Sequence, residues 1–292
     1  MNHPHPDSST SSPSFRQLLQ AGHNLVLPGI FNGIGARLAR RTGYEAIFIG
    51  GFPLVGTRYG VPDIGLKGLG DMRPAVAEIL AACDLPALVD MDDGYGDAKS
   101  AVHTLQSYER LGVSAVMVED QLWPKRCGHL DGKRVVPMED MVRKVRAMSR
   151  SRLNSETFII ARTDAREVHG LDDALRRAEA YLEAGADGLF IEAPHTEEEL
   201  RIIGKAFDVP QLANPLEGGR TPILPPQAYH EMGFRILPYG LHLLMRTVKV
   251  MEEALRDLRS QRFAMSYEDT AVSFEDYQDI VGLADWLKLE DG

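Results

Sequence analysis

Short apolar runs alternate with amphipathic segments along most of the 292-residue chain. Eight of these runs are rich in apolar and often β-branched residues, as expected for parallel strands that are buried on both faces. Helical patterns lie between them, and eight strands separated by helices predict a (β/α)8 TIM barrel rather than an open sheet. The predicted strands are Asn24–Phe31, Ala46–Gly51, Ala87–Asp92, Ala115–Asp120, Thr157–Thr163, Gly188–Ala193, Gln211–Leu216 and Arg235–Gly240.

Helix ends carry recognisable signals. Leu171–Gly185 is the clearest predicted helix, because its apolar residues recur on one face and a glycine stops it. Thr196 is followed by three glutamates, which predicts an N-cap with acid in the first helical turn. Glycines are predicted to close further helices at positions 43, 112 and 233.

Three parts of the chain are expected to differ in structure. Residues 1–14 are rich in Ser, Pro and His and lack the cationic start and apolar core of a signal peptide, so they predict a disordered leader. Residues 15–261 form the barrel, which is the predicted catalytic domain. Residues 262–292 carry aromatic residues on a helical background and predict a C-terminal helical extension, packed on a neighbouring subunit or on the outside of the barrel.

Composition narrows the class of protein. The formal net charge of -10 argues against a nucleic-acid surface, but a local cationic pocket or a metal can still attract an anionic substrate. No apolar stretch is long enough to span a membrane. Only Cys83 and Cys127 are present, so we expect no disulfide framework and a cytoplasmic location.

Carboxylates follow several predicted strands. The active site of such a barrel forms at the C-terminal ends of its strands, so Asp63, Asp90, Asp92 and Glu119 are expected at one mouth. Alternation along a strand places Asp90 and Asp92 on the same side. A hard cation relieves the mutual repulsion, and ligands made only of oxygen suit Mg2+ or Mn2+. These four residues are the predicted metal ligands, and a solvated turn is the alternative interpretation of the Asp-x-Asp pair.

Two polar residues at other strand ends are candidates for substrate binding. Arg162 presents a fork that matches a carboxylate, and its alternative is a structural ion pair with Glu192 or Asp164. Asn214 can donate to a substrate carboxylate or serve as an ordinary turn former.

A reactive thiol is predicted in the stretch Lys125-Arg126-Cys127-Gly128-His129. Nearby positive charge favours the thiolate, and the glycine allows the backbone to bend in a loop after a strand. The alternative is a solvated basic loop with an incidental cysteine.

Taken together, these motifs resemble the isocitrate lyase / phosphoenolpyruvate mutase superfamily from about Phe15 to about Ser260. Within it, Leu130–Arg134 and Glu217-Gly218-Gly219 look most like the branch of 2,3-dimethylmalate lyases, petal-death-type lyases and carboxyphosphonoenolpyruvate mutases. The resemblance rests on Pro62-Asp63, Asp90-x-Asp92-x-Gly94-Tyr95-Gly96, Glu119-Asp120-Gln121, Lys125–His129, Leu130–Arg134, Ala161–Ala165, Leu212–Asn214 and Glu217-Gly218-Gly219 with Thr221-Pro222.

The resemblance implies a Mg2+-dependent enzyme that cleaves a carbon–carbon bond of a small dicarboxylate or tricarboxylate. The expected reaction converts a substituted malate, similar to 2,3-dimethylmalate, into a 2-oxo acid such as pyruvate and a carboxylate. Catalytic residues are then Cys127, Arg162, His129 and Lys125. Substrate-binding residues are Gly50, Gly51, Phe52, Asn214, Glu192 and Gly128. The family also implies a homotetramer, a dimer of dimers that exchange their last barrel helix.

Two departures from the family pattern concern the pocket. After the second strand the family usually shows Ser/Thr-Gly, whereas this chain has Gly50-Gly51-Phe52, so the hydroxyl is missing and a bulky ring follows. Phe48 stands where methylisocitrate lyases carry a tyrosine, and a phenyl ring cannot transfer protons. Methylisocitrate cleavage, oxaloacetate hydrolysis and phosphonomutase chemistry stay open as alternative activities, and a barrel that binds without turnover stays open as the alternative class.

Overall fold

Eight parallel strands form a barrel in the computed structural model, which describes residues 13–128, 132–260, 262 and 270–289. The hydrogen-bonded order is β1-β8-β7-β6-β5-β4-β3-β2. A parallel bridge between Gly29 and Phe48 links β1 to β2, so the predicted (β/α)8 barrel is confirmed. The strands are β1 (Leu25–Pro28), β2 (Ile47–Ile49), β3 (Ala87–Asp90), β4 (Ala115–Glu119), β5 (Phe158–Thr163), β6 (Gly188–Ile191), β7 (Gln211–Leu212) and β8 (Ile236–Tyr239).

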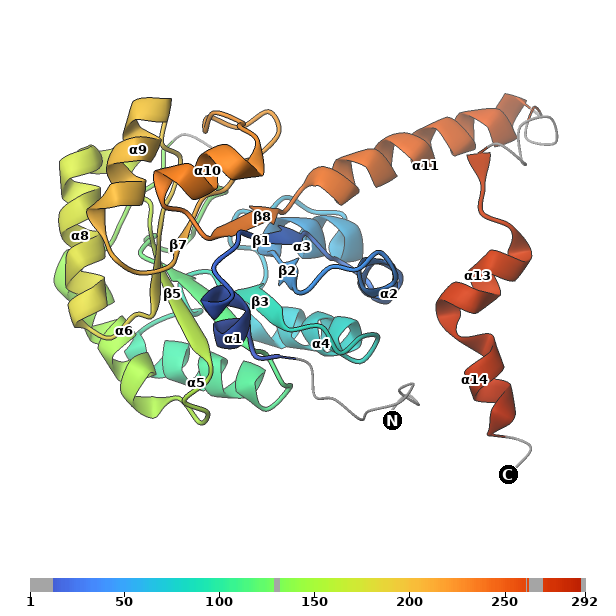
Figure 1. The fold of residues 1–292 in the computed structure, drawn as a ribbon, viewed down its shortest axis with the longest axis horizontal. Coiled ribbons are helices and arrows are strands. Elements are labelled where there is room, and N and C mark those ends of the chain that lie inside the picture. The colour runs from blue at the N-terminus through green and yellow to red at the C-terminus, as the bar shows by residue number, and fades with distance from the viewer. Residues whose placement is uncertain (1–12, 129–131, 261, 263–269, 290–292) are drawn as a thin grey trace.

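Helices surround the sheet (Figure 1). They are α1 (Phe15–Gln20), α2 (Gly33–Arg41), α3 (Gly51–Tyr59), α4 (Leu69–Leu80), α5 (Ala98–Glu109), α6 (Met138–Ser151), α7 (Ala165–His169), α8 (Leu171–Glu183), α9 (Glu197–Ala206), α10 (Pro226–Met232), α11 (His242–Ser260), α13 (Phe274–Val281) and α14 (Leu283–Lys288).

The expected helix ends are found. Thr196 caps α9, with its hydroxyl accepting the backbone N–H of Glu199 at 3.1 Å. The predicted stop of α8 at Gly185 has φ of 106°, a left-handed conformation that favours glycine. The glycines at 43, 112 and 233 also have positive φ after their helices.

Residues inside the barrel alternate with residues that face the helices. Leu88, Met117 and Ile160 belong to the inner apolar cluster, whereas their neighbours Val89 and Val118 pack in the outer one. Phe15 of α1 is fully buried in the inner cluster, where its ring centroid lies 5.9 Å from that of Phe158. The interior is therefore a filled core, and only its upper end can hold a ligand.

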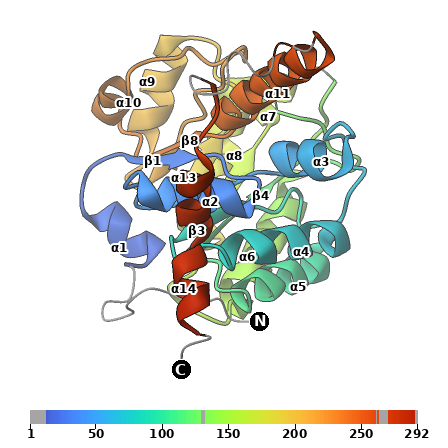
Figure 2. The same ribbon diagram turned by 90° about the vertical axis from the view of Figure 1, so that its right-hand side faces the viewer.

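The C-terminal helices leave this framework. α11 projects away from the barrel, and α13 and α14 run back beside α2 (Figures 1 and 2). Arg37 donates to the Ile280 carbonyl at 3.4 Å, and Arg41 pairs with Asp279 at 3.2 Å. The division at residues 14 and 261 stays a prediction, because residues 1–12, 261 and 263–269 lie outside the described part. Within the described ranges, no helix combines the length and apolar character needed to cross a lipid bilayer.

Candidate active site

The site residues occupy one layer of the barrel, directly above its apolar core. Met117, Phe190 and Leu212 are inward-facing core residues that also form the floor of the pocket. Two positions further along each of these segments stand Glu119, Glu192 and Asn214. Because side chains alternate along a strand, the next inward position beyond the floor places a polar group at the mouth. The same step leads from Leu88 to Asp90, from Ile160 to Arg162 and from Phe48 to Gly50.

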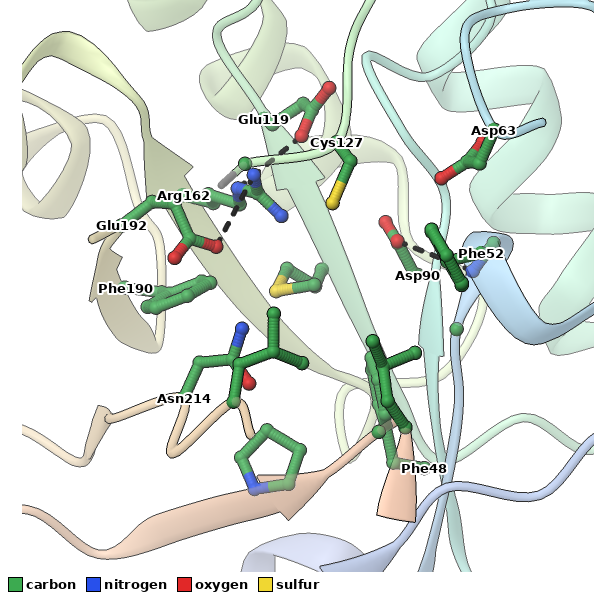
Figure 3. A pocket seen from close by; sticks show the side chains of 18 of the residues that line it. Phe48, Phe52, Asp63, Asp90, Glu119, Cys127, Arg162, Phe190, Glu192 and Asn214 are labelled. Atoms are coloured by element: carbon green, nitrogen blue, oxygen red, sulfur yellow. Dashed lines mark hydrogen bonds and ion pairs between the residues drawn. The ribbon is translucent and has the colours of Figure 1, made fainter. Parts of the chain in front are cut away.

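Nearly all predicted site residues line this one pocket (Figure 3). Asp92 lies behind the lining, paired with Lys125, and His129 falls outside the described residues. The lining includes Gly50, Gly51, Phe52, Asp63, Asp90, Glu119, Lys125, Cys127, Gly128, Arg162, Glu192 and Asn214.

Arg162 is held among three carboxylates. Its Nε and Nη2 donate to the two oxygens of Asp164 at 2.9 and 3.0 Å, and it also pairs with Glu119 and Glu192, both at 3.3 Å. Burial raises the pKa of Asp164, but Arg162 and Lys133 outweigh burial and lower it to about 2. The alternative interpretation, a structural ion pair, is thus observed, and the guanidinium still lines the pocket.

Two of the four predicted metal ligands pair with one ammonium group. Lys125 Nζ lies 2.6 Å from Asp63 and 2.8 Å from Asp92. Burial, together with the charges of Asp90 and Asp63, raises the pKa of Asp92 to about 7 although Lys125 lowers it. Glu119 Oε1 is buried and has no hydrogen-bond partner among the described residues. A further cation would reduce the repulsion between these carboxylates and would provide a partner for Glu119 Oε1.

The carboxylates fit a hard cation that keeps part of its water shell. Among the described residues, no three or more His, Cys, Asp or Glu side chains converge closely enough to form a complete ligand set. Mg2+ is commonly bound through one or two carboxylates, with water and substrate completing its octahedron. Asp90 suits this, because it lines the pocket and accepts backbone N–H groups from Asp92 at 3.0 Å and from Gly51 at 3.5 Å.

The alternation argument for Asp90 and Asp92 does not hold in detail. β3 ends at Asp90, and Asp92 has φ of 49°, so the extended pattern stops between them. The turn, and not the strand, brings Asp92 to Lys125.

The cysteine loop, residues 125–128, is held from below by side chains. Gln121 binds the Arg126 backbone twice, accepting its N–H at 3.0 Å and donating to its carbonyl at 2.9 Å. Lys133, fully buried, donates to the Gly128 carbonyl. Between these contacts Cys127 is half-buried, and Figure 3 shows its sulfur pointing into the pocket.

Phe48 fills the space that a side chain at position 50 would need. A Cβ on Gly50 would lie 2.9 Å from the Phe48 ring, closer than real Cβ contacts. Gly240 borders the same ring, at 3.2 Å from a Cβ built there. The absent hydroxyl at position 50 and the phenyl ring at position 48 are therefore one local arrangement.

Lys133 and Gln121 lie in motifs that carry the family resemblance, but the sequence analysis assigned neither of them a role in the site. Both act through the loop backbone, and neither stands at an inward-facing strand end. The spacing of apolar residues carries no signal for such contacts.

The chain is similar to known proteins over most of its length. A family model described as phosphoenolpyruvate phosphomutase matches residues 15–259. The 2,3-dimethylmalate lyase of Eubacterium barkeri is 36% identical over 280 residues, covering 96% of this chain and 97% of the relative. The petal death protein of Dianthus caryophyllus is 32% identical over 284 residues, covering 97% and 89%. A 2-methylisocitrate lyase of Bacillus subtilis is 36% identical over 277 residues, covering 90% of each.

Solved structures show the same likeness. Oxaloacetate acetylhydrolase in complex with 3,3-difluorooxalacetate superposes with a TM-score of 0.88 at 30% identity, covering 97% of this chain and 96% of that one. A 2,3-dimethylmalate lyase gives 0.87 at 33% identity, covering 94% and 92%. A phosphonopyruvate hydrolase complex with oxalate and Mg2+ gives 0.84 at 25% identity, covering 94% and 96%.

Proposed function

The chain belongs to the isocitrate lyase / phosphoenolpyruvate mutase superfamily of carbon–carbon lyases and mutases, and we propose that it is a Mg2+-dependent lyase of substituted malates. The substrate is a 2-hydroxy dicarboxylate similar to 2,3-dimethylmalate, and the products are a 2-oxo acid such as pyruvate and a carboxylate. One observation carries the proposal: a charged rim with Arg162 and Cys127 stands over an apolar floor. Such a pocket suits a dicarboxylate whose branches are hydrocarbon groups.

The metal would be held by Asp90, with Asp63, Asp92 and Glu119 around it. When bound, it supplies Lewis-acid polarisation of the C1 carboxylate and the 2-oxygen. The support from this chain is the orphaned Glu119 oxygen and the shortage of positive charge around these carboxylates. A related phosphonopyruvate hydrolase binds Mg2+ with oxalate, the kind of chelating dianion that this proposal requires.

The remaining chemistry is assigned to side chains of the pocket. A base takes the 2-hydroxyl proton, the C2–O bond becomes the carbonyl of the 2-oxo acid as the C2–C3 bond breaks, and the electron pair of the broken bond moves into the leaving carboxylate fragment. Arg162 and Asn214 donate to that dianion as negative charge develops on it. The Cys127 thiol then gives its proton to the carbanion carbon as general acid. Water must be kept from this carbanion, and residues of the cysteine loop line the pocket.

The test is a panel of malate derivatives, with release of 2-oxo acid as the readout. Turnover of 2,3-dimethylmalate to pyruvate with Mg2+, lost on chelation and restored by Mg2+, is the expected result. Cys127→Ser should reduce turnover by about 100-fold or more, because the hydroxyl is a far weaker acid. Oxalate and acetate from oxaloacetate would instead assign the hydrolase activity, and a phosphonate substrate followed by 31P spectroscopy would reveal mutase activity.

Methylisocitrate belongs in the same panel. Phe48 has no hydroxyl for proton transfer, and the floor beside it is apolar. We therefore expect slower cleavage of methylisocitrate than of dimethylmalate. The reverse order would contradict the proposed substrate class while leaving the lyase assignment in place.

A further inference from the structure

We propose that Lys133 is a positioning residue, which fixes Cys127 over the pocket by binding the Gly128 carbonyl. The effect of Lys133 on catalysis rests on the proposed function. The contacts of Lys133 and the first experiment below are independent of that function.

Lys133 Nζ makes two hydrogen bonds and one further ion pair at this point. An ammonium group has three donors. Nζ of Lys133 donates to the Gly128 carbonyl and to Asp164 Oδ1 at 2.9 Å, and it lies 3.0 Å from Glu167 Oε2. The side chain is 0% exposed, so water does not compete for these donors. A hydrogen bond from a buried ammonium to a loop carbonyl is charge-assisted and therefore holds the loop strongly.

The position of Gly128 is closely constrained. A Cβ at this residue would lie 2.7 Å from the Glu192 carboxyl carbon and would also overlap the Arg162 guanidinium. The loop backbone therefore packs directly on the cation that is proposed to bind substrate. Any shift of Gly128 also shifts the adjacent Cys127 relative to Arg162.

Cys127 sits between two anchors. Gln121 holds the Arg126 backbone on one side, and Lys133 holds the Gly128 carbonyl on the other. Among the described residues, these side chains bind the backbone on either side of the thiol. Removing Lys133 takes away the hydrogen bond to the backbone on one side of the thiol.

The Asp164 carboxylate connects Lys133 to Arg162, which is proposed to bind substrate. Asp164 accepts two hydrogen bonds from Arg162 and one from Lys133. Its own backbone N–H donates to the buried Asp120 at 2.9 Å, which fixes it to the barrel. Asp164 therefore fixes the position of the Cys127 thiol, through Lys133, relative to the Arg162 guanidinium.

The first experiment measures access to the thiol and needs no substrate. The probe is iodoacetamide, with labelling of each cysteine followed by mass spectrometry across pH. Cys83 is 6% exposed and burial raises its pKa, so it serves as a slow internal reference. At high pH, where the thiol is fully ionised, the rate reports access alone. In Lys133→Met we expect that plateau rate at Cys127 to rise on the order of tenfold.

Lys144→Met is the matched control. Lys144 is also buried, at 6% exposure, but it donates to the Asp93 carbonyl, and within the described ranges it makes no hydrogen bond to the cysteine loop. Its plateau rate should equal that of the parent. An unchanged plateau in a folded Lys133→Met protein would overturn the proposal.

The second experiment measures turnover with the substrate found in the panel. Lys133→Met should lower kcat by about 10- to 100-fold, because the proton donor is misplaced, with a smaller change in KM. Arg162 still binds Asp164 in this variant, so the fold should persist. If it does not, Lys133→Gln, which keeps a donor, serves in its place and should show a smaller rise in labelling. Equal kcat in variant and parent would contradict the positioning role, whereas an inactive parent would count only against the proposed function.

Discussion

At the scale of single residues, the Phe48 ring can occupy its position only because Gly50 has no side chain. The Phe48 ring is nearly buried and occupies the volume beside Gly50 and Gly240. A new side chain at position 50 must push this ring toward the ligand, because the barrel interior beneath it is filled.

Gly50→Ser should therefore weaken substrate use. Overpacking of this kind typically costs about 1–3 kcal/mol, so kcat/KM should fall by about 5- to 150-fold. The double variant Phe48→Ala with Gly50→Ser should recover part of the loss. Gly70→Ser is the control, because no atom lies within 4 Å of a Cβ built there. Steady-state kinetics on the three proteins decides this, and a fully active Gly50→Ser would show that the ring does not restrict the pocket.

Asp164 predicts a specific pH dependence of stability. Arg162 and Lys133 outweigh burial and lower its pKa from 3.8 to about 2. A carboxyl whose pKa is lower in the folded state stabilises that state above its unfolded pKa, and the contribution disappears as pH falls from about 4 to about 2. Asp164→Asn should lower the free energy of unfolding at pH 7 by about 3–5 kcal/mol, since two buried cations lose their shared partner. This substitution should also reduce the loss of stability as pH falls from about 4 to about 2, which is the acid limb of the stability curve. Urea unfolding across pH measures both, and parallel acid limbs would contradict the assignment.

At the scale of elements, apolar runs located every strand but not its end. The run Ala46–Gly51 exceeds β2, because Gly51 already begins α3, and the run Gln211–Leu216 contains only the two-residue β7. Residues beyond these strands are apolar because they are buried beneath the helices or line the pocket, not because they pair. Burial and pairing give the same sequence signal, so the periodicity cannot separate them.

The candidate site was predictable to the same extent. Parallel strands of a barrel end at one mouth, so Asp90, Glu119 and Arg162 could be placed together from the sequence. The contact of Lys133 with Gly128 could not, since it depends on how an irregular loop folds back.

The packing of α9 against the end of α10 depends on backbone contact between Gly204 and Gly233. A Cβ on Gly204 would overlap the Met232 carbonyl, whose carbon is 2.8 Å away. Gly204→Ala should lower the free energy of unfolding by about 1–3 kcal/mol. Gly56→Ala on α3, with no atom within 4 Å, should raise it by about 0.5–1 kcal/mol, because alanine favours helix. Denaturant titrations compare the two, and equal effects would show that helix propensity alone decides.

At the scale of the whole molecule, α11 presents an apolar stripe to solvent. Val248, Met251, Leu255 and Leu258 are 54, 58, 63 and 55% exposed, and their spacing places them on one face of the helix. A stripe of this kind marks an interaction surface. The barrel has an apolar groove between α2 and β8, lined in part by Leu38, Tyr44 and Tyr239.

We propose that α11 packs on a second copy of the chain, in a dimer of helix-exchanged dimers. Light scattering should then give a mass of four times 32.3 kDa for the parent. Leu255→Glu places a charge in the centre of the stripe, where burial against a partner would cost several kcal/mol, so smaller species should dominate. Lys249→Glu changes the charge of the same helix at a side chain that is 76% exposed, and it should leave the mass unchanged. A parent of 32.3 kDa at micromolar concentration would contradict the assembly, whereas a loss of mass in both variants would indicate that net charge, and not the apolar stripe, governs association.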